Sequence, residues 1–170
     1  MRDIKAVEVE EGKSAEGWMK VKPLRKALKN WFLFRLALIS PGKKNQFFYR
    51  AMGMKIGKNV QIMPMQKMDV FFPELISIGD GSVIGMDCFF ACHEFNPKEF
   101  RYGSITIGKN VLIGARTFIL PGVKIGDNSL VSAQTTIYKD IPENVIAFGS
   151  PLQFKPIEEK KEASQKPLKK

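Results

Sequence analysis

Branched aliphatic residues return at every sixth position in the second half of the chain, without a slip over five steps. The series consists of Ile107, Ile113, Ile119, Ile125, Val131 and Ile137. An α-helix turns by about 100° per residue, so six steps carry a side chain to the opposite face. A period-two strand of this length would need a polar break. The pattern therefore favours a coil with three flat sides, in which each side contributes one inward aliphatic residue and ends at a turn.

The same spacing recurs earlier in the chain, in two further groups of three. These groups are Ile56, Ile62 and Met68, followed by Ile78, Ile84 and Phe90. Three sixes make one turn of eighteen, so the chain divides into four stacked turns that begin at Ile56, Ile78, Ile107 and Ile125. Repetition on this scale is typical of a solenoid, and hexapeptide repeats are one kind of parallel β-helix. The sequence therefore predicts an all-β parallel β-helix over residues 56–155.

Two residue types occupy fixed places within the six-residue unit. Glycine follows the aliphatic residue as Gly57, Gly79, Gly85, Gly108, Gly114 and Gly126. Small or branched residues stand four places after it, as Val60, Ser82, Cys88, Val111, Thr117, Val123, Ser129 and Thr135. Residues of these types suit a tight corner and a narrow interior. Cys88 is therefore interpreted as a small apolar residue that lies at a corner or points inward.

The period fails at two places, and both failures predict loops that leave the coil. Four extra residues separate Met68 from Ile78, and the interval from Phe90 to Ile107 is 17 residues, five more than two repeats. The second loop, residues 91–104, contains His93, the only histidine in the chain. In a regular solenoid, such excursions carry function disproportionately often. His93 is therefore the first candidate for catalysis.

The residues before the coil predict two helices. Residues 22–39 place Leu24, Leu28, Trp31, Phe32, Arg35 and Leu36 on one side of a helix, and residues 44–52 form a shorter second one. Pro41 and Gly42 separate them as a breaker. The first strand edge of a β-helix must be covered, which gives these helices the role of a cap. The alternative is that residues 22–39 rest on a membrane surface as a basic, aromatic-rich amphipathic segment.

Length and composition place these elements in one domain with two polar ends. The chain has 170 residues, of which 44% are hydrophobic, and carries a formal charge of +10. We expect residues 1–21 to be flexible, residues 22–55 to form the helical cap and residues 156–170 to be a disordered charged tail. The positive charge would attract phosphates, yet no nucleic-acid recognition motif accompanies it, so no nucleic-acid partner is predicted. Residues 1–20 lack the apolar stretch of a secretory signal, which favours a cytoplasmic protein.

Residues 105–151 carry three elements that are specific in combination, namely PGVKIGDNS, KDIP and a late Gly-x-Pro. With them the chain closely resembles the hexapeptide-repeat acyltransferases, in particular the galactoside and maltose O-acetyltransferases and their relatives in polysaccharide synthesis. A weaker similarity extends back to about residue 56. The resemblance implies a left-handed β-helix, a homotrimer, and acetyl-CoA bound in the groove between two subunits. It also implies transfer of an acetyl group from acetyl-CoA to a hydroxyl of a small acceptor such as a saccharide.

The resemblance further implies roles for individual residues. His93 matches the catalytic histidine of the family, a general base that accepts the proton of the attacking hydroxyl. The main chain of Ala115 matches the oxyanion donor, and Ala115 and Ala133 are expected to line the CoA site. Lys139 and Lys155 are the basic side chains expected near the 3′-phosphate of CoA. Where relatives carry an acceptor-binding Asn, this chain has MPMQKMDVFF, so Gln66 and Asp69 are the candidates for acceptor contact.

Several alternatives remain open at this point. The acceptor could be an amine instead of a hydroxyl, and the coil could be a non-catalytic scaffold that binds partners. A zinc-dependent carbonic anhydrase on the same fold needs three histidines, so no metal site is predicted for a chain that has one. Glu94 is interpreted as a solvated charge and not as a partner of His93. Cys92 adjoins His93 but is not expected to be a nucleophile, because members of the family it resembles do not use a covalent cysteine.

Overall fold

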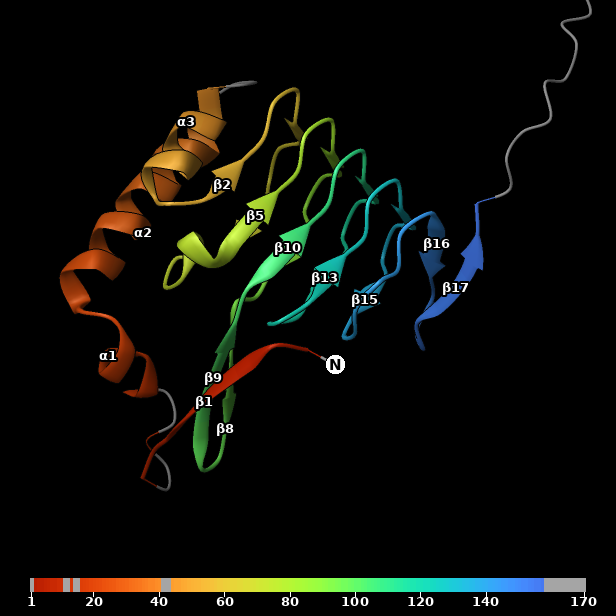
Figure 1. Ribbon diagram of the computed structural model, residues 1–170. Helices are drawn as coiled ribbons and strands as arrows, with labels where there is room; N and C mark the ends of the chain where they lie inside the picture. The colour runs from red at the N-terminus through yellow and green to blue at the C-terminus, as the bar shows by residue number, and fades with distance from the viewer. Residues whose placement is uncertain (1, 11–12, 14–15, 41–43, 158–170) are drawn as a thin grey trace, which may run out of the picture.

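The computed structural model describes residues 2–10, 13, 16–40 and 44–157. Figure 1 shows short strands stacked as successive coils along one axis, with helices over the N-terminal end and a hairpin that projects to one side. The charged tail at residues 158–170 and the breaker at Pro41 and Gly42 lie outside the described residues. None of the helices in the described ranges is long and apolar enough to cross a membrane.

The coil is built from three parallel sheets within the described residues, one for each side of the spiral. The first sheet contains β2 (Lys55–Ile56), β5 (Ile76–Ile78), β10 (Ile105–Ile107) and β13 (Lys124–Ile125). The second contains β3 (Gln61–Ile62), β6 (Val83–Ile84), β11 (Leu112–Ile113), β14 (Leu130–Val131) and β16 (Val145–Phe148), with β17 (Gln153–Pro156) added antiparallel at its end. The third contains β4 (Lys67–Met68), β7 (Phe89–Phe90), β12 (Phe118–Ile119) and β15 (Thr136–Ile137).

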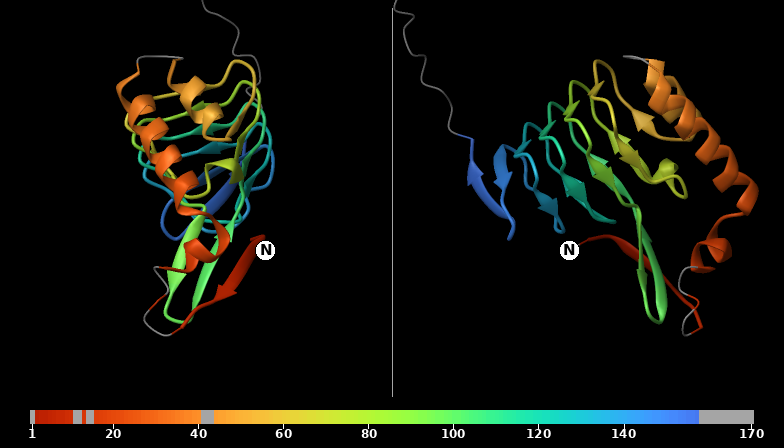
Figure 2. Two further views of the ribbon diagram at one scale, coloured as in Figure 1. Left: turned by 90° about the vertical axis from the view of Figure 1, so that its left-hand side faces the viewer. Right: turned by 180° about the vertical axis from the view of Figure 1, so that it is seen from behind.

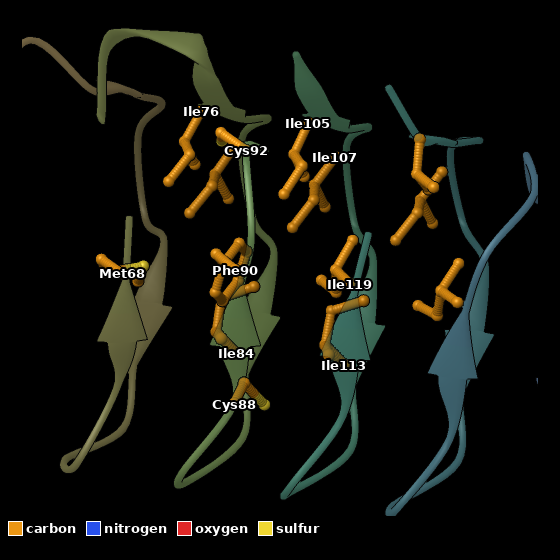
Figure 3. Close-up of a cluster of buried hydrophobic side chains, with 14 of the residues drawn as sticks. Met68, Ile76, Ile84, Cys88, Phe90, Cys92, Ile105, Ile107, Ile113 and Ile119 are labelled. Atoms are coloured by element: carbon orange, nitrogen blue, oxygen red, sulfur yellow. The ribbon is translucent and has the colours of Figure 1, made fainter. Parts of the chain in front are cut away.

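The register of these sheets confirms the four predicted turns. Ile56 pairs with Ile78, Ile78 with Ile107, and Ile107 with Ile125, so the first residues of successive turns stand in one column. The repeating aliphatic residues at the other two sides are stacked in the same way, and Figure 3 shows such columns inside the coil. Ile84, Ile113 and Ile119 are at most 1% exposed. Burial of one large apolar side chain per side, repeated along the axis, forms the core.

The corners explain the small residues four places after each aliphatic. Val60, Ser82, Cys88, Val111, Thr117, Val123, Ser129 and Thr135 are all between 0% and 2% exposed. The residue just before each of them forms the turn, and there the backbone frequently adopts positive φ, for example 53° at Asn110 and 57° at Asn128. Asn and Asp tolerate this left-handed region better than most residues, because their short polar side chains bond locally. The corner therefore favours Asn, Asp or Gly on its outside, with Arg116 and Gln134 as departures, and a small side chain on its inside.

The N-terminal helices cap the first coil, which confirms the predicted cap. They are α1 (Gly17–Val21), α2 (Leu24–Ile39) and α3 (Lys44–Ala51). On α3, Tyr49 is 1% exposed and the Gln46 side-chain amide donates a hydrogen bond of 2.8 Å to the carbonyl of Val60. The α2 helix packs through Ala27, Asn30 and Ala37, and Asn30 donates to the carbonyl of Val70 at 3.1 Å. The cap thus covers the open end of the coil with both apolar and hydrogen-bonding contacts.

The structure corrects the prediction that residues 1–21 are flexible. Strand β1 (Ile4–Glu8) pairs antiparallel with β9 (Glu99–Gly103), which in turn pairs with β8 (His93–Asn96). The second loop therefore supplies two strands, β8 and the central strand β9, of a separate sheet of order β1-β9-β8. A two-stranded hairpin alone is marginally stable, and β1 satisfies the main-chain groups along the edge of β9. The α1 helix also falls in this range.

Removal of residues 2–8 should loosen the hairpin without disturbing the coil. We expect amide hydrogen exchange of residues 99–103 to become at least about tenfold faster, because the edge hydrogen bonds of β9 are lost. Exchange of residues 105–119 and 124–137 serves as the internal control and should not change; Pro121 and Gly122 are left out because Arg2 and Asp3 bond their carbonyls. Mass-spectrometric exchange on the intact and shortened chains measures both, and equal protection of residues 99–103 in the two proteins would contradict the assigned pairing.

Candidate active site

The two loops that interrupt the period leave the coil at the same corner. Each begins after a strand of the third sheet and returns to a strand of the first, one loop after β4 and the other after β7. The first loop ends in a short 3₁₀ helix, η2 (Pro73–Leu75), and the second forms the β8–β9 hairpin. Because consecutive coils are stacked, the two excursions lie one above the other. This stacking brings Asp69, the first residue of one loop, against His93 of the next.

Asp69 and His93 form a close pair. The Nδ1 atom of His93 lies 2.6 Å from the Oδ2 atom of Asp69. The side chain of Asp69 is completely buried, whereas that of His93 is 18% exposed. Sequence reasoning did not assign a partner to the histidine. The pair could have been inferred from the fact that both breaks in the period follow a third-sheet strand, which places them at one corner.

The main chain fixes the role of Asp69 as an acceptor. Its Oδ1 atom accepts N–H groups from Phe71 at 2.8 Å and Phe72 at 3.0 Å, and Oδ2 accepts the N–H of Cys92 at 2.8 Å. N–H donors thus point at both oxygens of this buried carboxyl group, so it faces His93 as an acceptor. The hydrogen bond to His93 therefore runs from Nδ1–H to the carboxylate. In that tautomer the other ring nitrogen, Nε2, carries a lone pair and can accept a proton.

Aromatic rings hold the imidazole in place. The ring of Phe100 stacks on that of His93 at a centroid distance of 5.8 Å, while Phe71 and Phe95 meet it edge-on at 5.2 and 5.1 Å. These rings come from both loops and from both strands of the hairpin. A catalytic group is most effective when packing and hydrogen bonds fix its orientation before the substrate arrives. The site has this property, because rotation of the imidazole would break the bond to Asp69 and lose the ring contacts.

Glu94 does not contact His93 but links the hairpin to the N-terminal strand. Its two carboxylate oxygens lie 3.4 Å from Nη1 of Arg2 and 3.5 Å from Nη1 of Arg101, and the side chain is 23% exposed. It is therefore an ion-paired group and not a solvated charge as predicted. Arg101 also pairs with Glu99, and hydrogen bonds to Glu99 first and Glu94 next raise the pKa of its guanidinium.

The two cysteines are interior residues. Figure 3 shows them at opposite ends of the same coil, with Cys92 beside Ile76 and Ile105. The Cys88 thiol lies 3.3 Å from the carbonyls of Gly85 and Gly114 at a corner, as predicted. Burial, followed by the charge of Asp69, raises the pKa of Cys92 well above its usual range. Cys92 therefore stays a neutral thiol, which agrees with the prediction that it is not a nucleophile.

The alanines expected to line the CoA site lie at a different corner from His93. Ala115 and Ala133 stand in successive coils between the second and third sheets, and the Ala115 carbonyl accepts the N–H of Gln134 at 2.9 Å. Lys139 stands at the same corner as His93, between the third and first sheets, but two coils further along. Lys139 and Lys155 are exposed near the C-terminal end, where the Lys139 ammonium lies 4.9 Å from the centre of the Phe154 ring. Within one chain, His93 is therefore separated from Ala115 and Ala133 by one side of the coil.

The burial of Gln66 and Asp69 argues against direct contact with an acceptor. Gln66 is 1% exposed, and its amide donates to the carbonyls of Met63 at 2.7 Å and Gly85 at 2.8 Å. Gln66 stands four places after Ile62, at the position whose side chain points inside the corner. It therefore occupies the interior of the coil. Asp69 is fully engaged with main-chain amides and His93. The sequence could not distinguish these roles, because the same residue types occur in acceptor sites.

Within the described residues, no group of three His, Cys, Asp or Glu side chains could hold a metal ion. What the site offers is one oriented imidazole with a buried carboxylate behind it. An arrangement of this kind removes a proton from a weak nucleophile and then stabilises the imidazolium ion that forms.

Comparison with known proteins gives a consistent result. Residues 104–139 match the model of the family described as bacterial transferase hexapeptide (six repeats). The chain is 40% identical over 134 residues to the protein named "Putative acetyltransferase YvoF" from Bacillus subtilis (strain 168), covering 78% of both chains. It is 34% identical over 119 residues to the galactoside O-acetyltransferase of Lactococcus lactis subsp. lactis (strain IL1403), covering 67% of this chain and 54% of that one.

Solved structures share the fold. A hexapeptide-repeat acetyltransferase from Vibrio cholerae O1 biovar eltor, complexed with acetyl-CoA, superposes with a TM-score of 0.69 at 19% identity, over 79% of this chain and 88% of that one. The maltose O-acetyltransferase of Clostridium difficile 630 gives a TM-score of 0.65 at 23% identity, over 86% and 96% of the two chains. The shared architecture is the left-handed parallel β-helix, which confirms the predicted fold class.

The assigned tautomer of His93 can be measured directly, because the untagged chain contains a single histidine. In ¹⁵N-labelled protein at neutral pH, the imidazole should carry its proton on Nδ1, whereas free histidine prefers Nε2. Asp69→Asn should abolish this preference. Asp80→Asn is the matched control, since Asp80 caps the Lys58 N–H at a different corner. Long-range ¹H–¹⁵N spectra that show the Nε2–H tautomer in the unmodified protein would contradict the geometry.

Proposed function

This chain belongs to the family of hexapeptide-repeat acyltransferases, and from that premise we propose that it transfers the acetyl group of acetyl-CoA to a hydroxyl group of a saccharide. The observation that carries the proposal is the His93–Asp69 pair, in which the imidazole is oriented with Nε2 available as a base. A non-catalytic scaffold would not need a buried carboxylate held by three main-chain donors behind its one histidine. The saccharide class is supported by relatives named galactoside and maltose O-acetyltransferases.

The pair performs the proton transfers of this reaction. Nε2 of His93 takes the hydroxyl proton while the oxygen attacks the thioester carbonyl, and a tetrahedral oxyanion forms. As the C–S bond breaks and the new ester remains, the imidazolium returns its proton to the CoA sulfur. Asp69 stabilises the imidazolium through Nδ1–H, so the charge that develops on the ring is compensated inside the site. The main-chain N–H of Ala115 is the proposed donor to the oxyanion.

The active site is proposed to lie between subunits of a homotrimer. His93 stands at the corner between the third and first sheets, whereas Ala115 and Ala133 stand at the corner between the second and third. The corner that carries Ala115 and Ala133 in one subunit can face the corner that carries His93 in the next, and cyclic symmetry repeats that contact until the ring closes.

The outer surfaces of the sheets support this arrangement. On the second and third sheets, Leu112 is 42% exposed and Phe89 is 39% exposed, and Phe89 stacks with Phe118 at 4.7 Å. The outward residues of the first sheet are polar, namely Lys55, Ser77, Thr106 and Lys124. Exposed apolar side chains on two adjacent sides, beside the polar Gln61 of the second sheet and Lys67 of the third, support contacts with neighbouring subunits.

Lys139 and Lys155 are proposed to contact the 3′-phosphate of CoA. The Lys139 ammonium lies 4.9 Å from the centre of the Phe154 ring, and that of Lys155 lies 5.9 Å from the centre of the Phe148 ring. Phe154 and Lys155 are consecutive in β17 and point to opposite faces of the strand, so the two lysines approach the C-terminal end of the coil from different sides. Exposed lysines at this end of the coil can bind a phosphate as point charges.

Substitution of His93 tests the proposed chemistry. His93→Gln should lower kcat about a hundredfold to ten-thousandfold, the usual contribution of a general base, with little change in KM for acetyl-CoA. Release of free CoA thiol with galactosides and maltosides as acceptors provides the assay. Asp80→Asn, which alters a carboxylate at a distant corner, is the control and should keep full activity. Full acetyl transfer by the His93→Gln protein would contradict the assignment.

Mixed oligomers test the location of the site. The unmodified protein should sediment with three times the 19.2 kDa mass of the chain. His93→Gln and Ala115→Trp should each be inactive, the second because the bulky ring blocks the CoA groove. Co-expressed together, they should regain about a quarter of the activity, since random assembly pairs an intact His93 with an intact Ala115 at about one interface in four. No recovery in oligomers shown to contain both chains would place the site within one subunit.

A further inference from the structure

The α2 helix presents an apolar side to solvent. Six residues on this side, here called the α2 outer face, are between 41% and 79% exposed: Leu24, Leu28, Trp31, Phe32, Leu38 and Ile39. Their spacing of three, four and seven residues places them in one stripe along the helix. The sequence had placed most of these residues on one side of a helix, and the structure shows that this side points away from the coil. Figure 2, left, shows α2 lying across the end of the molecule with no described element over it.

The opposite side of α2 is firmly attached to the body. Ala27, Asn30 and Ala37 are buried, and just before the helix Lys22 bonds both carboxylate oxygens of Glu74 at 2.7 Å and also the carbonyl of Phe71. The helix therefore does not depend on a partner to fold. A face that is already ordered loses little conformational entropy when it binds.

All the charged residues of α2 are cations. Between Glu16 and Asp69 the chain contains twelve Lys and Arg residues and no Asp or Glu. On α2 itself, Arg25 and Lys29 are exposed along one margin of the outer face, and the guanidinium of Arg35 lies 5.8 Å from the ring of Trp31 within it. Glu74 lies beside the helix near Lys26 and Lys29, and both of its carboxylate oxygens are bound by Lys22. An apolar stripe with tryptophan and phenylalanine on a helix whose own charges are all positive is typical of helices that lie in the interface of an anionic bilayer.

We propose that the α2 outer face docks on the surface of an anionic lipid bilayer, with the helix parallel to the membrane plane. The apolar side chains enter the boundary between headgroups and acyl chains, while Arg25 and Lys29 contact lipid phosphates. Aromatic side chains such as Trp31 and Phe32 are favoured at this depth.

A second copy of the chain fits the same face poorly. A two-fold contact would bring Arg25, Lys29 and Arg35 of one helix against the same residues of the other, with no acidic residue on α2 to compensate them. Like charges brought together in this way disfavour association. A lipid headgroup supplies the missing negative charge, which favours the membrane over self-association.

The helical cap that carries the α2 outer face is also in contact with the candidate site. Trp18 of α1 contacts Phe71 at a ring distance of 4.7 Å, and Phe71 contacts His93 at 5.2 Å. The helical cap and the candidate catalytic residue are therefore parts of one packed aromatic cluster. The docking proposal does not depend on the chemistry at His93, so each can fail without the other.

Vesicle co-sedimentation of the full chain tests the docking. The probes are vesicles of phosphatidylcholine alone and of phosphatidylcholine containing 30% phosphatidylglycerol, at low and high salt. We expect binding to the anionic vesicles that weakens with salt. Trp31→Ser combined with Phe32→Ser keeps the charge of the protein and should weaken binding at least about tenfold by removing two inserted side chains. Arg25→Glu with Lys29→Glu should weaken it about twenty-five-fold or more, at about fivefold for each cation lost.

The controls separate this face from general electrostatic attraction. Lys55→Glu with Lys124→Glu changes the net charge equally, on exposed residues of the first sheet, and should have a much smaller effect than the α2 pair. His93→Gln should bind vesicles like the unmodified protein. Unchanged vesicle binding after Trp31→Ser and Phe32→Ser would overturn the proposal. A lower sedimentation mass of that variant without vesicles would also overturn it, because the face would then be a contact between copies.

Discussion

The parallel stacking of one coil on the next is the constraint on which the other features depend. Each coil donates main-chain hydrogen bonds to its neighbour, for example from Gly79 N–H to the Ile107 carbonyl at 2.8 Å. On the first sheet the spacing leaves no room for a side chain at the position after the aliphatic residue: a Cβ atom on Gly79 would lie 2.5 Å from the Gly108 carbonyl oxygen. Glycine there, a small residue inside the corner and an aliphatic residue on each side are consequences of one repeated contact.

The same stacking builds the candidate site. The two inserted loops are separate in the sequence but begin at equivalent points of successive coils. Asp69 and Cys92 therefore lie side by side, and the Cys92 N–H donates a hydrogen bond to the carboxylate of Asp69. A buried carboxylate is unfavourable unless it is well hydrogen-bonded, and the main chain of the two loops supplies those bonds. The regular coil thus provides a rigid base, while the departures from regularity provide the chemistry.

The helical cap covers the first coil of the β-helix, while the outer side of α2 stays exposed. A β-helix exposes the edge of its first coil, and α3 with the inner side of α2 covers it. That task uses Tyr49 of α3 with Ala27, Ala37, Leu33 and Phe34 of α2, but not the six apolar residues of the α2 outer face. Capping and membrane contact, which were alternatives for residues 22–39 in the sequence, are compatible because they concern opposite sides of one helix.

The sequence by itself determined the coil, its four turns, the two loops, the helices of the cap and the candidate base His93. These features could be predicted because each is set by contacts that repeat at a short, fixed interval or by local helix periodicity. Only the tertiary structure decided that residues 4–8 form a strand, since their partner β9 lies about ninety residues away and the segment has no periodicity of its own. It likewise decided that Asp69 holds His93, that Gln66 is buried in a corner, and which side of α2 faces out. The spacing indicates that the two loops share a corner and that Gln66 stands at an inside position, but the contacts that these side chains make depend on how the folded segments pack together.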